Sequence, residues 1–302
     1  MVPLYAGVEL GGTKVICGLA YENGNLQERK EIRTLAPQHT LPQIRAILDA
    51  FVMDHGQFAA LGIGTFGPVR LDRSAPDFGH LGPSPKTLWR NCDLYGFFRQ
   101  WLAVPIALDT DVSAAAIGEV KWGAAVGCET AVYITVGTGI GGGVIVAGRP
   151  VHGLLHPELG HMRVQRAAGD EFSGSCPCHM DCVEGMAAGP AIVQRWGSQL
   201  AQLPPGHSAY KLIAHYLAHL VTNVILLVAP QKIVLGGGVM SNRALFPLIR
   251  KKVQRLLNGF IAIDQIENRI DDLIVPPGLD ADAGVLGAIA TAIETGSSKK
   301  PT

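Results

Sequence analysis

The stretch VELGGTKVICG, residues 8–18, places a pair of glycines between two short apolar runs. Each run has the length of one strand, and the turn between them carries little side-chain bulk, so the pattern predicts two antiparallel strands joined by a backbone loop. A second stretch, YITVGTGIGGGVIV at residues 133–146, repeats the order of strand, Gly-Thr loop and strand. The repeat predicts a chain built from two similar halves.

Strands and helices alternate around both stretches, which is typical of a two-domain α/β architecture. The first half is predicted to contain strands at 4–10, 15–21, 26–34, 60–65 and 106–109, and helices after Pro37 and at 112–123. The second half is predicted to contain strands at 131–136, 144–147 and 232–235, a glycine loop through Gly143, and helices at 212–227, 243–257 and 283–294. We place a small N-terminal α/β domain at 1–115, joined by the C-terminal helix 283–296, and a larger α/β domain at 116–282.

Charge and composition argue against some classes of function. The 302 residues carry 25 basic and 25 acidic side chains, so the broad basic surface required for DNA or RNA is missing, and we expect no nucleic-acid partner. The first residues show no basic and apolar leader, and glycines interrupt the long uncharged stretch at 130–148, which favours a hairpin over a membrane span. We expect a cytoplasmic protein without a membrane partner.

Three glycine clusters follow predicted strands: Gly11 with Gly12, the run VGTGIGGG at 136–143, and LGGGV at 235–239. Loops of this kind let backbone N–H groups approach phosphate oxygens closely, and Thr13 and Lys14 can add a hydroxyl and a cation. A single such loop is more often only a hairpin. Three of them at strand ends favour one shared polyphosphate ligand.

Two aspartates, Asp109 and Asp111, lie where the strand of LDTDVSAAAIGE passes into a helix. An aspartate at this position can cap the helix by accepting N–H bonds from its first turn. It can also act as a general base toward a substrate hydroxyl. The residues alone do not separate these two interpretations.

Cysteines and histidines crowd into CPCHMDCVEG, residues 176–185, and HPELGHMRV precedes this run. Zinc prefers four thiolate or imidazole ligands, and His161 or His156 can supply the fourth. The spacings do not match the C-x-x-C of a redox pair, so we favour zinc. A loop fixed by metal can direct the neighbouring carboxylates Glu158 and Glu184 toward a small polyhydroxylated ligand.

Eight motifs occur in one order along almost the whole chain: ELGGTK, GIGTFGPV, TDVSAAAIGE, YITVGTGIGGG, HPELGHM, CPCHMDCVEG, AAGPAI and IVLGGGV. In this order they resemble the ROK family of bacterial sugar kinases and repressors, and among its members the zinc-containing fructokinases. The resemblance implies the actin-like ATPase (hexokinase/ribonuclease H-like) fold, in which two α/β domains bind ATP and sugar in the cleft between them.

The resemblance also implies a role for particular residues, with Asp111 as the catalytic base. ATP, together with Mg²⁺, would be bound by Gly11, Gly12, Thr13, Lys14, Gly137, Thr138, Gly139, Gly189, Gly237 and Gly238. The hexose would be bound by Asp111, Glu158, His161, Glu184 and Lys86, the last of these from SPKTLWRN. Zinc would be bound by His161, Cys176, His179 and Cys182, with Cys178 as an alternative to His179.

Three positions depart from the family pattern: Ser113 replaces asparagine, Glu9 replaces the aspartate of the magnesium loop, and Leu88 replaces a glycine in SPKTLW. We predict an ATP-dependent hexose kinase for fructose, with mannose, glucose and N-acetylmannosamine as alternative acceptors. A sugar-responsive regulator without turnover is the alternative of another class. The presence of Asp111 and the lack of a helix-turn-helix before the first strand disfavour it. The family implies a homodimer.

Overall fold

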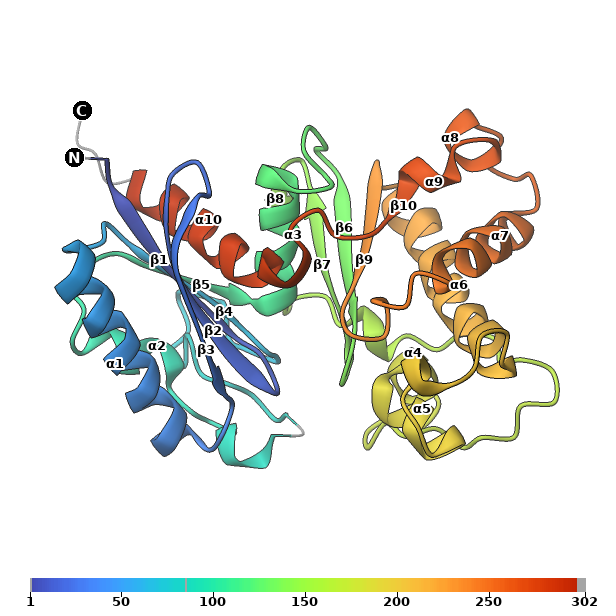
Figure 1. The fold of residues 1–302 in the computed structure, drawn as a ribbon, viewed down its shortest axis with the longest axis horizontal. Coiled ribbons are helices and arrows are strands. Elements are labelled where there is room, and N and C mark those ends of the chain that lie inside the picture. Colours follow the sequence, from blue (N-terminus) through green and yellow to red (C-terminus); the bar gives the residue numbers. More distant parts are fainter. Residues whose placement is uncertain (1, 85, 298–302) are drawn as a thin grey trace. The chain divides into compact units, whose positions relative to one another are not determined.

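The computed structural model describes residues 2–84 and 86–297, and these divide into two compact units, each described by itself (Figure 1). Among the described residues, the first unit holds those up to Val126, the segment Arg149–His156 and those from Gly278 onward. The second unit holds Gly127–Gly148 and Pro157–Pro277. The domain boundaries given above stay a prediction.

The first unit contains a mixed sheet with the strand order β3-β2-β1-β4-β5. β1 pairs antiparallel with β2 and parallel with β4, so the carboxyl ends of β1, β4 and β5 meet at one edge. The strands are β1 (Leu4–Leu10), β2 (Lys14–Tyr21), β3 (Leu26–Arg33), β4 (Leu61–Thr65) and β5 (Ile106–Thr110), with β8 (Arg149–Pro150) also in this unit. The helices are α1 (Pro37–His55), α2 (Leu94–Arg99), α3 (Asp111–Trp122) and α10 (Ala283–Ser297), with short 3₁₀ turns at Thr87–Trp89 and Asp280–Asp282.

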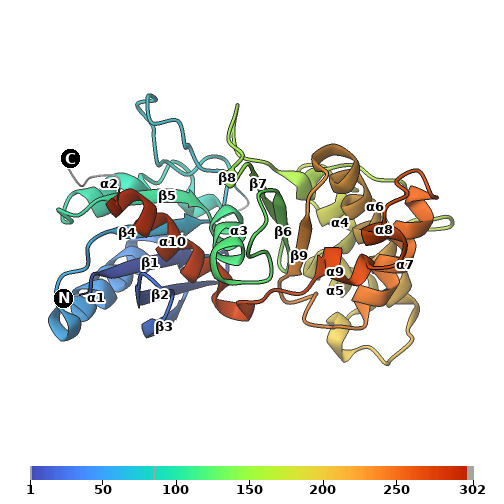
Figure 2. The ribbon, with the colours of Figure 1, turned by 90° about the horizontal axis from the view of Figure 1, so that it is seen from above.

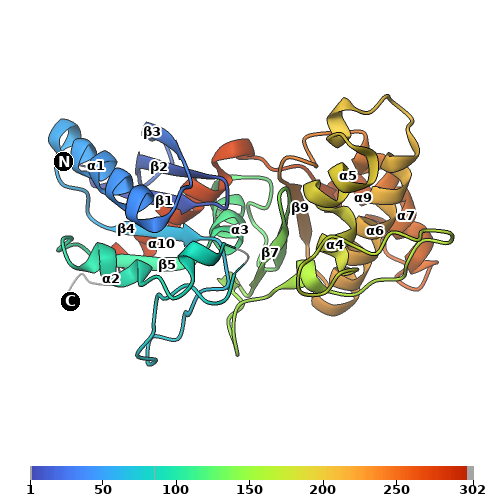
Figure 3. The same ribbon diagram turned by 90° about the horizontal axis from the view of Figure 1, so that it is seen from below.

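Alternation along the strands sends side chains to two apolar layers, one on each face of this sheet. Figures 2 and 3 view the ribbon from opposite sides, with α10 on one face of the sheet and α1 on the other. Val8 and its same-face neighbours pack with α1, whereas Ile16 packs with α10. The backbone of α10 comes so close that a Cβ on Gly62 would lie 1.7 Å from the Ala288 carbonyl oxygen. Glycine at this position therefore lets α10 lie directly on the strands.

The second unit repeats this arrangement. β6 pairs antiparallel with β7 and parallel with β9, as β1 does with β2 and β4, so the predicted similarity of the two halves is confirmed. The strands are β6 (Ala131–Val136), β7 (Ile140–Val146), β9 (Lys232–Gly236) and β10 (Ile274–Val275). The helices are α4 (Val183–Ala187), α5 (Gly189–Trp196), α6 (Ser208–Val228), α7 (Leu245–Leu257), α8 (Asp264–Glu267) and α9 (Ile270–Leu273), with 3₁₀ turns at Leu159–His161 and Leu200–Gln202.

The glycine loop predicted to run through Gly143 is wrong, because β7 begins at Ile140. Only residues 137–139 connect the two strands. The glycines of β7 leave room for a packed neighbour: a Cβ on Gly142 would lie 2.5 Å from the Leu159 side chain. Glycine serves here for close packing against a strand, and not as a turn.

Helix α6 has the length and apolar composition that a membrane span needs, and it is the one such helix in the described part of the chain. In the structure 56% of its most apolar window is buried, and Ile213, Leu217 and Leu220 belong to the core of the second unit. The burial explains the apolar composition as that of a core helix.

Candidate functional site

The two aspartates of LDTDV have different surroundings in the first unit. Asp109 Oδ2 lies 3.0 Å from His152 Nε2, and Asp109 Oδ1 accepts the Thr110 N–H at 2.7 Å. Asp111 is the first residue of α3, and its hydrogen bonds come from backbone N–H groups, its own and that of Val112. Asp109 is thus held by a side chain that can be cationic, whereas among the described residues the hydrogen bonds of Asp111 come from backbone.

Two carboxyl groups with raised pKa values belong to this edge of the sheet. Burial raises the pKa of Asp111 to about 6. Burial, and then the charge of Asp111, raise the pKa of Glu9 near the carboxyl end of β1 to about 7. Such perturbed carboxyl groups are typical of functional sites, where a general base must titrate near the working pH.

Glu9 also fits the magnesium role implied by the family resemblance. Its Oε2 atom is buried and has no hydrogen-bond partner among the described residues. A buried carboxylate oxygen without a partner needs a cation or an ordered water, and oxygen ligands are what Mg²⁺ prefers. The longer side chain of glutamate therefore does not remove the predicted cation site.

The first glycine loop, residues 11–13, is held by a hydrogen bond of its own backbone and by Thr34, the residue that follows β3. The Gly11 N–H donates to the Lys14 carbonyl at 3.0 Å, and the Thr34 hydroxyl donates to the Gly11 carbonyl at 2.7 Å. The Thr34 N–H donates to the Thr13 carbonyl at 3.0 Å. The loop therefore keeps a defined shape without a ligand, as a preorganised phosphate site requires.

The two predicted lysines differ in their relation to this loop. Lys14 Nζ lies 3.1 Å from a carboxylate oxygen of Glu31 on β3. Lys86, predicted as a sugar ligand, lies against the loop, because a Cβ on Gly12 would lie 3.2 Å from Lys86 Cε. The structure thus places Lys86 beside the predicted phosphate loop, and Lys14 in an ion pair.

In the second unit, three glycine segments come together. The Gly189 N–H donates to the Gly137 carbonyl at 2.7 Å, and a Cβ on Gly137 would lie 3.9 Å from the Gly238 nitrogen. Gly237 has φ of +88°, and a Cβ there would lie 2.5 Å from the Val136 carbonyl oxygen. Thr138 is exposed at the tip of the same loop. These segments, far apart in sequence, present backbone to one place, as a single phosphate-bearing ligand would need.

Glu184 has a contact that the sequence did not reveal. Its Oε2 atom accepts the Ile140 N–H at 2.9 Å, and a Cβ on Gly139 would lie 2.7 Å from the same oxygen. Glu184 belongs to α4, which directly follows the cysteine-rich loop. It therefore ties that loop to the glycine loop between β6 and β7.

Four potential metal ligands meet in the second unit: the ligand atoms of His161, Cys176, His179 and Cys182 lie within 4.8 Å of one another. Cys176 Sγ is 3.8 Å from Nδ1 of His161 and of His179, and Cys182 Sγ is 3.6 Å from Nδ1 of His161. With zinc bonds of about 2.3 Å to sulfur and about 2.0 Å to nitrogen, a tetrahedron separates such atoms by roughly 3.6 Å. The donor set and its spacing therefore fit zinc.

The alternative metal ligands, Cys178 and His156, are not part of this group. Cys178 is exposed and is not part of it. His156 belongs to the first unit, where its Nε2 accepts the Val69 N–H at 3.2 Å. Glu158 immediately precedes the 3₁₀ turn that carries His161. The geometry therefore favours His161 over His156, and His179 over Cys178, as metal ligands.

Comparison with known proteins gives consistent results. The model of the ROK family matches residues 5–295. Fructokinases of Zymomonas mobilis and Pediococcus pentosaceus are each 37% identical, over 96% of this chain and 96% and 97% of theirs. A ROK family glucokinase from Streptomyces griseus, solved in complex with glucose and AMPPNP, is 26% identical with a TM-score of 0.74, over 96% of this chain and 99% of that one. The predicted actin-like ATPase fold is confirmed.

Proposed function

The chain belongs to the ROK family and is a sugar kinase, and from this premise we propose that it transfers the γ-phosphoryl group of ATP to the 6-hydroxyl of fructose. The half-buried Asp111, whose hydrogen bonds among the described residues come from backbone and whose pKa is raised to about 6, is the observation that carries the proposal. Such a group is ionised at neutral pH and basic enough to accept a proton in the transition state.

In the proposed reaction Asp111 accepts the proton of the sugar hydroxyl while the oxygen of that hydroxyl forms a bond to the γ-phosphorus. The bond between that phosphorus and the bridging oxygen of ADP breaks, and ADP leaves with the electron pair. The loops at 11–13 and 137–139 would bind phosphate oxygens through backbone N–H groups other than those of Gly11 and Gly137, which donate to the carbonyls of Lys14 and Gly139. Mg²⁺, held through Glu9, would supply positive charge against the phosphates.

For recognition of the sugar we assign the side chains that the family resemblance names: Asp111, Glu158, His161 and Glu184. His161 can serve both metal and sugar, because Nδ1 faces the metal group and Nε2 is the ring nitrogen on the other side. The position of Lys86 on the loop of Gly12 supports a phosphate contact as well as the sugar contact predicted for it.

Zinc would have a structural role in this enzyme. The four protein ligands proposed above complete a tetrahedron and leave no coordination position for a substrate or a reacting water. The metal would hold the loop that carries His161 and leads into Glu184. A homodimeric state, a cytoplasmic location and the ATP contacts of Gly189, Gly237 and Gly238 belong to the same proposal.

Activity is expected to fall as the pH drops through about 6, because protonated Asp111 cannot accept the hydroxyl proton. Below this pH, kcat/KM for the sugar should decrease by about tenfold per pH unit. Glu9 titrates in the same range, so the apparent pKa of the profile belongs to the two carboxyl groups together. A profile that stays flat down to about pH 5, in protein shown to be folded there, would contradict the assignment of the base.

The sugar preference is tested by comparing kcat/KM for fructose, mannose, glucose and N-acetylmannosamine with Mg-ATP and zinc-replete protein. We expect fructose to be highest, by about one to two orders of magnitude, since single groups in a pocket discriminate by about this much. A higher kcat/KM for another hexose would keep the kinase and overturn the fructose assignment.

A further inference from the structure

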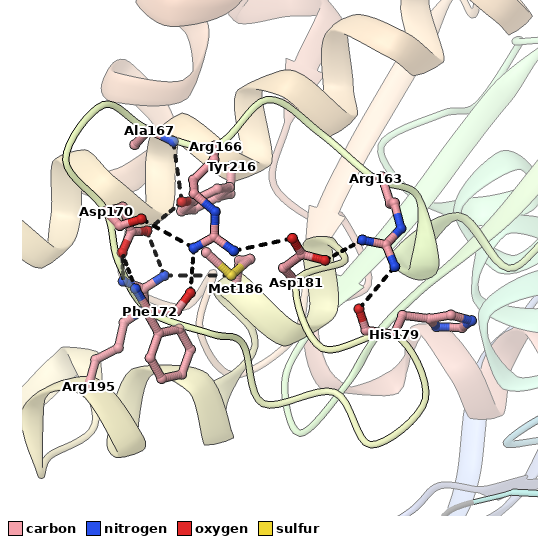
Figure 4. Close-up of polar contacts among 10 residues, drawn as sticks. All are labelled: Arg163, Arg166, Ala167, Asp170, Phe172, His179, Asp181, Met186, Arg195 and Tyr216. Carbon is pink, nitrogen blue, oxygen red and sulfur yellow. Dashed lines mark hydrogen bonds and ion pairs between the residues drawn. The ribbon is translucent and has the colours of Figure 1, made fainter.

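Asp181 lies between two of the proposed metal ligands, His179 and Cys182, and is held from outside the metal group by two arginines (Figure 4). Arg163 donates to Oδ1 of Asp181, and Arg166 donates to Oδ2 at 3.2 Å. Arg163 also donates to the His179 carbonyl at 3.4 Å. The loop of residues 176–182 is thus held by hydrogen bonds to its backbone, at the His179 carbonyl, and to the Asp181 side chain, which is not one of the proposed metal ligands.

The two arginines precede a segment, residues 170–172, that is anchored in the interior of the second unit. Arg195 of α5 makes two parallel hydrogen bonds of 2.8 Å to Asp170, and each of these two side chains is only 7% exposed. Against the raising effect of burial, Arg195 and then the Tyr216 hydroxyl keep the pKa of Asp170 at about 2. The Arg195 guanidinium also lies 4.1 Å from the centre of the Phe172 ring. This anchor therefore has little freedom to move.

Arg166 connects the anchor to the metal loop. One of its terminal nitrogens donates to the carbonyls of Asp170, at 3.2 Å, and of Phe172, while the other donates to Asp181 (Figure 4). An isolated exposed ion pair is worth little, because ordering two long side chains offsets the attraction. Here the arginine is already ordered by the carbonyls of the anchored turn, so its bond to Asp181 costs less entropy.

We propose that Arg166 and Asp181 are positioning residues that preorganise the metal loop, so that losing either weakens metal binding although every metal ligand remains. The proposal rests on the metal site of the proposed function. Groups that orient metal ligands from outside typically change metal affinity by about 10- to 100-fold when substituted. The same change is expected here.

The test measures the Zn²⁺ dissociation constant by competition with a chromogenic chelator, for wild type, Arg166→Gln and Asp181→Asn. Both variants should bind zinc at least about tenfold more weakly than wild type. Asp264 and Arg269 of the α8 region form a comparable exposed pair, 2.5 Å apart, so Asp264→Asn and Arg269→Gln serve as matched controls and should bind zinc as wild type does.

Arg166→Gln separates positioning from bulk electrostatics, because removing a positive charge near a cation should by itself tighten zinc binding. Weaker binding by this variant supports positioning; binding that is unchanged or tighter overturns the proposal. Wild-type protein that binds no zinc would overturn the metal site itself. Circular dichroism of each zinc-free variant establishes that it is folded, and hydrogen exchange of residues 176–182 should be faster in Arg166→Gln than in Arg269→Gln.

Discussion

Asp111→Asn is expected to lower kcat for sugar phosphorylation by about two to four orders of magnitude, the usual contribution of a general base. The amide has nearly the same shape and can still accept the Val112 N–H, so the start of α3 should be preserved. It cannot accept the proton of the attacking hydroxyl. The measurement is steady-state kcat at saturating ATP and sugar, on protein whose thermal unfolding matches that of wild type.

Asp109→Asn is the matched control, since it makes the same chemical change two residues away. It weakens the contact with His152, but in our account it removes no group that reacts, so kcat should stay within about tenfold of wild type. Near-normal turnover in folded Asp111→Asn, or a larger loss in Asp109→Asn, would show that Asp111 is not the base.

Cys182→Ser is expected to release zinc and to lower kcat/KM by at least about 100-fold, because the buried thiolate is one of four proposed ligands. Without the metal, the loop that carries His161 and precedes Glu184 loses its fixed geometry. Zinc content by elemental analysis and kcat/KM for the sugar are measured on the same preparation.

Cys178→Ser makes the same substitution at an exposed thiol of the same loop. It should keep one zinc per chain and normal activity. Loss of zinc in Cys178→Ser, with zinc retained in Cys182→Ser, would reverse the ligand assignment. Full activity in verified zinc-free wild type would contradict the role of the metal.

The sequence patterns predicted the features that depend on residues close together in the chain. The two hairpins followed from short apolar runs around glycines, and a possible zinc site from the crowding of cysteines and histidine at 176–182. The choice of Cys176, His179 and Cys182 within that run came from the family resemblance. The start of β7 was missed because its glycines accommodate Leu159, a neighbour that periodicity does not reveal. Helices α2, α4 and α5, of 6, 5 and 8 residues, are too short for a clear helical period.

The features of the site that the sequence did not reveal depend on contacts between residues far apart in the chain. Asp109 and Asp111 were equivalent in the sequence, and the side chain that distinguishes them, His152, is 43 residues from Asp109. The sequence motifs assigned no role to Asp181 or Arg166. Their relation to the metal loop emerges only when the turn at Asp170 is anchored by Arg195 of α5.

One measurement tests the central claim most directly: zinc-replete protein is incubated with Mg-ATP and fructose, ADP release is followed, and the phosphorylated product is identified by ³¹P NMR. The account predicts that ADP and fructose 6-phosphate form in equal amounts, and that ADP release without sugar is far slower. The account would be contradicted if fructose caused no ADP release, or if the phosphoryl group were transferred to water, giving inorganic phosphate, or to another hydroxyl of the sugar.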